Sequence, residues 1–153
     1  MTAQATPEVE HDRQEILRLH AVWLKANHGL HPAGMREAFV DGNKFYGFNL
    51  NTHTYHEVDE WVRLWEYLRT TEHLDLAVES TNVRITLRGD IGWLTWEGRV
   101  KATLPDGSDL SGSGKMRGTE VYMRQDASGN RVWKMWHCHY SFAAPEGEPR
   151  PGV

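Results

Sequence analysis

The sequence predicts an α+β fold in which a curved antiparallel sheet wraps over three helices of the N-terminal half. Apolar residues recur every three or four positions through the first half of the chain and alternate with polar residues through the second half. Helices segregated from an antiparallel sheet are typical of the α+β class. A long curved sheet folded over three helices would form a cone with an internal cavity.

Three segments of the first half have a helical pattern. The first runs from about Glu8 to His28, the second from Pro32 to Asp41, and the third, with the clearest apolar stripe, from Val58 to Arg69. Between the second and the third, Lys44–Leu50 and His53–Tyr55 are expected to form a short hairpin.

Four strands are predicted in the second half, over residues 82–88, 92–104, 117–125 and 132–142. We expect one apolar face of this sheet to lie outside, where it is too large to leave in water and would pair two copies as a homodimer. The residues expected on this outer face are Leu94, Trp96, Val100, Trp136, Cys138, Tyr140 and Phe142.

The length of 153 residues fits one domain, expected over residues 11–143, with disordered tails at 1–10 and 144–153. The net charge is −4 with no Lys/Arg cluster, which disfavours nucleic acid as a partner. No apolar run approaches the roughly 20 residues that cross a bilayer, so no membrane partner is expected. With one cysteine there is no internal disulfide, and we expect a cytoplasmic protein.

His137 and His139 are two residues apart on a predicted strand, so both should point to the same face, together with Trp133, Met135 and Ser141. Three interpretations stay open: a metal site, hydrogen-bonded core histidines, or a general acid or base. A metal site would need a third ligand, and the sequence has no HExxH motif or other dense cluster. It also lacks a phosphate-binding loop, so we expect no metal and no organic cofactor.

Glu97 and Arg99 also share a strand face. They form either a solvated surface with a weak ion pair or a cavity wall where Arg holds an oxyanion and Glu moves a proton. His20, beside Trp23 on the first helix, is either a core residue or a cavity residue. Trp61 and Trp65, one helical turn apart, either fill the core or stack on a planar substrate.

Two stretches resemble known proteins. Trp133–Ser141, after Thr119–Tyr122, resembles the end of the association domain of calcium/calmodulin-dependent protein kinase, with a Trp followed by His-x-His-x-Ser. Phe48–Asn51, followed by Trp61 and Trp65, resembles SnoaL-like proteins of the nuclear transport factor 2 superfamily. The resemblance covers most of the chain from Glu15 to Phe142 and implies a cone-shaped fold.

The resemblance also implies a site. Epoxide hydrolases of this superfamily place an Arg and an acid two apart on a middle strand, a Tyr on an early strand and a second acid on a late one. Those places correspond to Arg99, Glu97, Tyr46 and His137, the last being His rather than an acid. These four residues are the predicted catalytic set. The predicted substrate-binding set is His20, Trp23, Trp61, Trp65 and His139.

The superfamily's enzymes suggest a cofactor-independent lyase or isomerase that uses acid–base chemistry on a small hydrophobic, aromatic molecule. One member releases formaldehyde from lignin-derived diarylpropanes, so a phenolic diaryl compound is one expected substrate. The alternatives are a non-catalytic oligomerisation or ligand-binding domain and a metal-free carbonic anhydrase-like enzyme. A deep apolar cavity would favour an organic substrate, a small polar one bicarbonate, and a filled one the oligomerisation domain.

Overall fold

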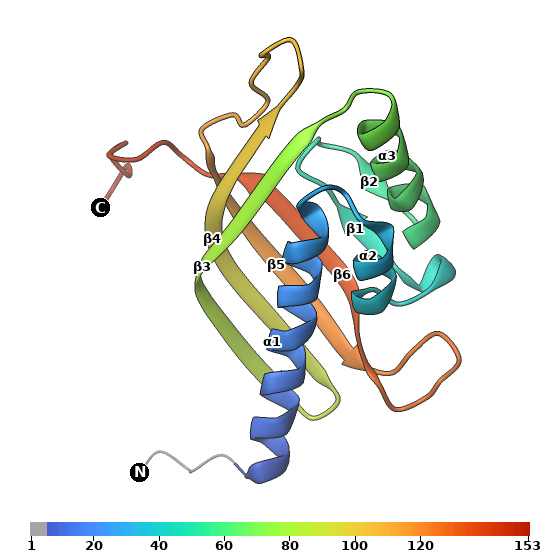
Figure 1. Ribbon diagram of the computed structural model, residues 1–153. Coiled ribbons are helices and arrows are strands. Elements are labelled where there is room, and N and C mark those ends of the chain that lie inside the picture. The colour runs from blue at the N-terminus through green and yellow to red at the C-terminus, as the bar shows by residue number, and fades with distance from the viewer. Residues whose placement is uncertain (1–5) are drawn as a thin grey trace.

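Three helices lie on one face of a six-stranded curved sheet, as the computed structural model shows for residues 6–153 (Figure 1). The predicted α+β cone is therefore confirmed. The helices are α1 (Pro7–Asn27), α2 (Pro32–Ala38) and α3 (Val58–Thr70), with a 3-10 turn at Gly42–Lys44. The strands are β1 (Tyr46–Phe48), β2 (Thr54–Tyr55), β3 (Asp75–Arg88), β4 (Ile91–Thr103), β5 (Lys115–Arg124) and β6 (Trp133–Phe142).

The sheet is mixed, which corrects the expectation of a purely antiparallel one. The strand order is β2-β1-β6-β5-β4-β3, and every neighbouring pair is antiparallel except β1 and β6. The short strand β1 pairs in parallel with the last strand, Tyr46 opposite His137 and Phe48 opposite His139. Parallel neighbours need a long connection, and here α3 and the four strands β2 to β5 supply it.

The first helix begins within residues 1–10, the segment predicted to be a disordered tail. α1 starts at Pro7, whose fixed φ suits the first helical position. The Thr6 hydroxyl caps the helix by accepting from the Val9 N–H at 3.4 Å. Residues 7–10 therefore belong to the domain, and residues 1–5 of the predicted tail lie outside the described part of the chain. At the other end, residues 144–153 contain turns and irregular structure.

The apolar face of the sheet is its concave face, which corrects its expected place outside. On β4, Leu94, Trp96 and Val100 are buried under the helices, whereas Glu97 and Arg99 are exposed on the convex face. The prediction that these apolar and charged residues lie on opposite faces of β4 is correct, but the apolar residues lie inside rather than outside. The apolar stripes of the helices need an apolar partner surface, and only this face of the sheet supplies one.

A β-bulge reverses the alternation within β6. Met135 pairs with Tyr122 and His137 pairs with Val121, so Trp136 has no partner on β5. Trp133 and Met135 are buried before the bulge, and Cys138 and Tyr140 are buried after it. The extra residue turns His137 and His139 to the convex face. The prediction that they share a face with Trp133 and Met135 is therefore wrong.

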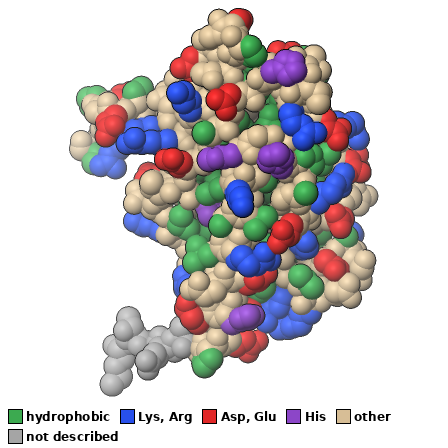
Figure 2. Space-filling view, viewed as in Figure 1, with side chains coloured by type: hydrophobic (Ala, Val, Ile, Leu, Met, Phe, Trp, Pro, Cys, Tyr) green, Lys and Arg blue, Asp and Glu red, His purple; other side chains and the backbone are tan. Residues whose placement is uncertain are grey.

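Exposed ion pairs join the helices to one another. Arg18 of α1 contacts Glu37 of α2, and Arg36 of α2 contacts Asp59 of α3. On the helix-bearing face, basic and acidic side chains are interspersed (Figure 2). Such exposed pairs contribute little to stability, so the helices are held mainly by apolar packing. Within residues 6–153, no helix has the length and apolar character needed to span a membrane.

Aromatic side chains also lie on the convex face, which no helix covers. Trp93, Val121, His137 and Tyr46 occupy one row across four strands. Trp93 is 39% exposed and Tyr46 is 42% exposed. This row is an apolar surface available for a partner, whereas of the residues expected on the outer face only Phe142, at 38%, is comparably exposed.

We predict that two copies pair through this convex face. Light scattering at micromolar concentration should give about twice the chain mass of 17.6 kDa. Trp93→Lys should shift the protein to monomer, because it places a charge inside the contact. Tyr67→Lys, a change at an equally exposed aromatic residue of α3, should leave the dimer intact. A wild-type mass of 17.6 kDa would contradict the prediction.

Candidate active-site cavity

A cavity of about 280 Å³ lies between the helices and the concave face of the sheet. Its wall is made by α1, α3, the β1–β2 loop, and the inward side chains of β3 to β6. Aliphatic residues, most of them leucines and valines, form much of the lining: Leu50, Leu64, Leu68, Leu74, Leu76, Val78, Val100, Ala102 and Leu110. An apolar space of this kind binds apolar ligand surface.

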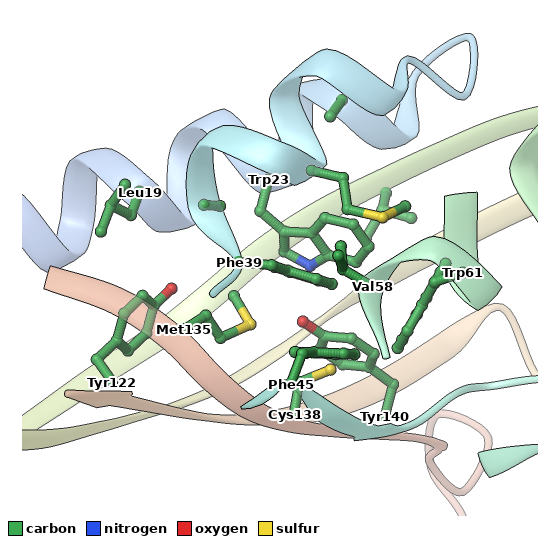
Figure 3. Packing of buried hydrophobic residues seen from close by; sticks show 14 of the residues in the cluster. Leu19, Trp23, Phe39, Phe45, Val58, Trp61, Tyr122, Met135, Cys138 and Tyr140 are labelled. Carbon is green, nitrogen blue, oxygen red and sulfur yellow. The ribbon is translucent and has the colours of Figure 1, made fainter. Parts of the chain in front are cut away.

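One wall of the cavity is a column of aromatic rings. Trp23 stacks on Trp65 with centroids 5.1 Å apart and planes inclined by 8°, and on Tyr140 at 6.0 Å and 16°. Trp61 meets Trp23 edge to face at 5.7 Å. Figure 3 shows Trp23, Trp61 and Tyr140 converging from α1, α3 and β6. The rigid rings give this wall a flat shape that complements a planar molecule.

Tyr140 is the one ionisable side chain among the residues that line this cavity. The other polar side chains of the lining are the amides Asn27, Asn49 and Asn51 and the indoles. Asn49 and Asn51 belong to the β1–β2 loop, where their carbonyl oxygens accept the backbone N–H groups of Leu50 and His53. Acid–base chemistry in the cavity therefore depends on Tyr140 and on whatever Tyr140 contacts.

Tyr140 contacts a fully buried carboxylate. Glu120 of β5 has no solvent exposure, and its Oε1 accepts from the Tyr140 hydroxyl at 3.1 Å and from Trp96 Nε1 at 3.0 Å. Its Oε2 accepts from the Tyr122 hydroxyl at 2.7 Å and lies 2.9 Å from His20 Nδ1. Buried carboxylates are tolerated when their lone pairs are filled in this way. We call these five residues the Glu120 cluster.

Burial changes the acidity of three groups in and beside this cluster. It raises the pKa of Tyr140 well above 10.0, and the neighbouring Cys138 and Glu120 raise it further. The pKa of Tyr122 is raised by burial and then by Glu120. Burial likewise raises the pKa of the Cys138 thiol. Tyr140 therefore stays protonated at neutral pH and can act as a hydrogen-bond donor or acid.

Two glycines make room for the Trp96 indole that joins the cavity to Glu120. A Cβ on Gly118 would lie 2.3 Å from Trp96 Nε1, and one on Gly98 would lie 2.5 Å from Trp96 Cζ3. Gly118 pairs with Trp96 across β4 and β5. The indole thus lies in a slot that excludes side chains on both strands, which fixes its N–H toward Glu120.

The structure brings part of the predicted substrate-binding set together. Trp23, Trp61 and Trp65 all line the cavity while also belonging to the buried core. Trp61 and Trp65 are therefore core residues, and stacking on a planar substrate stays a prediction that their place in the cavity wall permits. His20 lies one layer behind the cavity wall, 3% exposed, as a member of the Glu120 cluster.

The predicted catalytic set does not converge on the cavity. Glu97 and Arg99 are exposed on the convex face, where Glu97 accepts from the Asn82 side chain at 2.7 Å. Tyr46 and His137 do lie together, with ring centroids 5.7 Å apart, and His137 Nδ1 donates to the Tyr46 carbonyl at 2.6 Å. The expectation that these side chains line the cavity is wrong because the wrong sheet face was assigned to the interior.

His139, the remaining predicted binding residue, is also exposed on the convex face, with its ring 5.3 Å from that of Phe48. Within residues 6–153 no group of three or more His, Cys, Asp or Glu side chains is placed to hold a metal ion. Cys138, expected on the outer face, is buried on the concave face instead.

Sequence reasoning missed Glu120, Tyr140 and Ser80. The sequence does contain a signal for Glu120. Met116, Gly118, Glu120 and Tyr122 occupy every second position of β5, so Glu120 shares the apolar side of the strand with the other three. A charged residue in such a register indicates a buried carboxylate. Ser80 lies in the first half of β3, which begins seven residues before the predicted strand.

Comparisons with known proteins agree with the fold. The family model described as a SnoaL-like domain matches residues 16–145. No curated protein sequence matches the chain.

Solved structures share the fold at low sequence identity. A nuclear transport factor 2-like protein from Salmonella enterica superposes with a TM-score of 0.72 at 15% identity, covering 90% of this chain and 96% of that one. A proposed dehydratase of the NTF2-like family from Streptomyces avermitilis gives 0.69 at 14% identity, covering 91% and 99%. A proposed ketosteroid isomerase from Shewanella frigidimarina gives 0.60 at 17% identity, covering 81% and 92%.

Gly118→Ala should destabilise the protein by about 1–3 kcal/mol, the usual range for overpacking. The added methyl group meets Trp96 and forces its indole away from Glu120. Urea denaturation followed by tryptophan fluorescence measures the change. Thr119→Ala, at the adjacent exposed position of β5, is the control. Equal urea midpoints for Gly118→Ala and Thr119→Ala would contradict the steric conflict between Trp96 and a side chain at position 118.

The free energy of unfolding should fall as the pH rises above about 10, the ordinary tyrosine value. The unfolded chain then releases the protons of Tyr122 and Tyr140 while burial keeps the folded hydroxyls protonated, so the unfolded state binds fewer protons. Each group contributes at most about 1.4 kcal/mol per pH unit. Denaturation curves from pH 8 to 11 measure this slope.

Tyr122→Phe removes one of these groups and should make the alkaline slope shallower. The variant also loses a hydrogen bond, whose contribution to the free energy of unfolding does not depend on pH near pH 8. The difference between variant and wild type at pH 8 measures that contribution, and the change in slope is taken relative to it. An unchanged slope would contradict the contribution of Tyr122.

Proposed function

The chain belongs to the SnoaL-like domain family, and from that premise we propose that it is a cofactor-independent isomerase or lyase for a small hydrophobic, planar molecule. The family and its dehydratase- and isomerase-named structural neighbours fit an isomerase- or lyase-type function. The observation that carries the proposal is the apolar cavity whose one ionisable lining side chain, Tyr140, donates to the buried Glu120.

The lining favours an organic substrate over the two alternatives. Bicarbonate would need a small polar site, whereas the walls here are leucines, valines and aromatic rings. A pure oligomerisation domain would need no open interior, whereas this one keeps a volume of about 280 Å³. That volume is near the lower end of typical ligand pockets, about 300–1,000 Å³, and suits a compact aromatic ligand.

Tyr140 is suited to hydrogen bonding with a substrate oxygen that gains negative charge or leaves as hydroxide. Its hydroxyl is protonated at neutral pH, and in an apolar cavity a fixed donor stabilises developing charge more than it would in water. Without a ligand this hydrogen is donated to Glu120 Oε1 at 3.1 Å, and in the proposal a bound substrate oxygen accepts it instead, while Oε1 keeps the Trp96 N–H as its donor. Enolisation and loss of a hydroxyl group are the two reaction classes that need such a donor.

Tyr140→Phe should lower turnover by about 10²–10³-fold while the cavity still binds its ligand. The ring and its stacking on Trp23 remain, and only the hydroxyl is lost. Binding is measured first, by quenching of tryptophan fluorescence with a panel of phenols, aryl ketones and phenolic diaryl compounds. Turnover is then measured on each compound that binds, with release of formaldehyde assayed separately.

The matched control is Tyr67→Phe, which removes a hydroxyl from an exposed residue of α3 and should leave turnover unchanged. A second variant, Leu110→Trp, narrows the cavity at a half-exposed position and should weaken binding. Full turnover by Tyr140→Phe would show that the chemistry is elsewhere. Binding that is unaffected by Leu110→Trp would show that the ligand does not use this cavity.

A further inference from the structure

A second hydrogen-bonded chain connects the Glu120 cluster to β3. It begins at Glu120 Oε2, 2.9 Å from His20 Nδ1, and continues from His20 Nε2 to the Ser80 hydroxyl at 3.1 Å. The three side chains come from β5, α1 and β3 and are separated by up to 100 residues in sequence. No other serine has a histidine partner within hydrogen-bond distance among residues 6–153.

We propose that Ser80, His20 and Glu120 form a nucleophilic relay that gives the protein an esterase-type activity on carboxylic esters with a small apolar acyl group. A nucleophile, a base within 2.6–3.2 Å and a third group that orients the base are the geometric requirements for such a relay. The same arrangement occurs on unrelated folds and is identified by these roles rather than by sequence position.

The hydrogen-bond partners of Glu120 determine the tautomer that the relay needs. Trp96, Tyr122 and Tyr140 donate three hydrogen bonds to the carboxylate. A carboxylate oxygen accepts, so His20 donates from Nδ1 to Glu120, and in the imidazole form that the relay uses its Nε2 lone pair faces the Ser80 hydroxyl. Trp96 packs edge to face on the His20 ring, with centroids 5.6 Å apart, and fixes its orientation.

Ser80 is accessible where Glu120 and His20 are not. It lies partly buried on β3, the strand at the open edge of the sheet, and a β-bulge follows it between Thr81 and Arg84. Bulges are frequent beside active sites because they redirect neighbouring side chains. Val78, two residues before Ser80 on the same face, lines the apolar cavity. The two positions are about 7 Å apart along the strand, so an ester whose carbonyl carbon lies at the Ser80 oxygen would direct its acyl chain toward Val78 and the cavity.

Water is the second substrate of the proposed ester hydrolysis. The Ser80 oxygen attacks the ester carbonyl carbon while its proton passes to His20 Nε2. The ester C–O bond then breaks, and the leaving alcohol takes that proton. His20 next removes a proton from water, whose oxygen attacks the acyl-serine, and the carboxylic acid leaves as Ser80 regains its proton. Glu120 keeps its hydrogen bond to Nδ1 throughout.

A fluorophosphonate tests the nucleophile without knowledge of the natural substrate. The wild-type chain is incubated with the probe at neutral pH, and the adduct is located by peptide mass spectrometry. We expect one adduct, on Ser80, together with hydrolysis of p-nitrophenyl butyrate. Ser80→Ala should abolish both, and His20→Gln should slow both by about 10²–10⁴-fold, the usual contribution of a general base. Circular dichroism checks that each variant is folded.

Ser141→Ala is the matched control, because Ser141 is a partly exposed strand serine with no histidine partner, and it should label as fast as the wild type. The proposal is overturned if wild-type Ser80 stays unmodified while a reference serine hydrolase in the same tube is fully labelled. It is also overturned if the adduct lies on another residue. Since labelling needs no ligand in the cavity, this result is independent of the Tyr140→Phe outcome.

Discussion

The burial of Glu120 is the constraint on which the interior depends. A carboxylate with no contact to water is stable only when its lone pairs are filled by donors, and the donors here come from α1, β4, β5 and β6. A shift in the register of any of these elements would leave one or more of the donors unpaired. Apolar packing alone permits some sliding, whereas this cluster selects one arrangement of the first helix on the sheet.

Trp96 and Tyr140 have two roles because each is amphipathic. Their rings line the cavity, and their N–H and O–H groups bind Glu120. Phenylalanine in place of Tyr140 would keep the ring and leave the carboxylate short of a donor, and in place of Trp96 it would also leave part of the indole's space empty. The result is a cavity with apolar walls that lies one side-chain layer away from a negative charge. The ionisable side chains of Glu120 and His20 lie behind rather than within this wall.

Periodicity predicted the helices and strands well, and its failures concern information that is not local. Alternation on β4 shows which residues share a face, but the side that meets the helices is decided by their apolar stripes, including Trp61 and Trp65. Had that requirement been applied first, the exposure of Glu97 and Arg99 would have followed. The bulge at Trp136 depends on how β6 pairs with β5, so no pattern within β6 could reveal it.

The candidate site shows the same division between local and distant information. The position of Glu120 among apolar residues of β5 indicates a buried carboxylate, but its partner His20 lies 100 residues away and only the fold brings it near. A histidine on an apolar helix face is usually a satisfied core residue, and His20 is one. The two ring nitrogens, however, have different partners, so the bond that satisfies Nδ1 also aims Nε2 at Ser80. A buried histidine can therefore have a structural role through one ring nitrogen and a chemical role through the other.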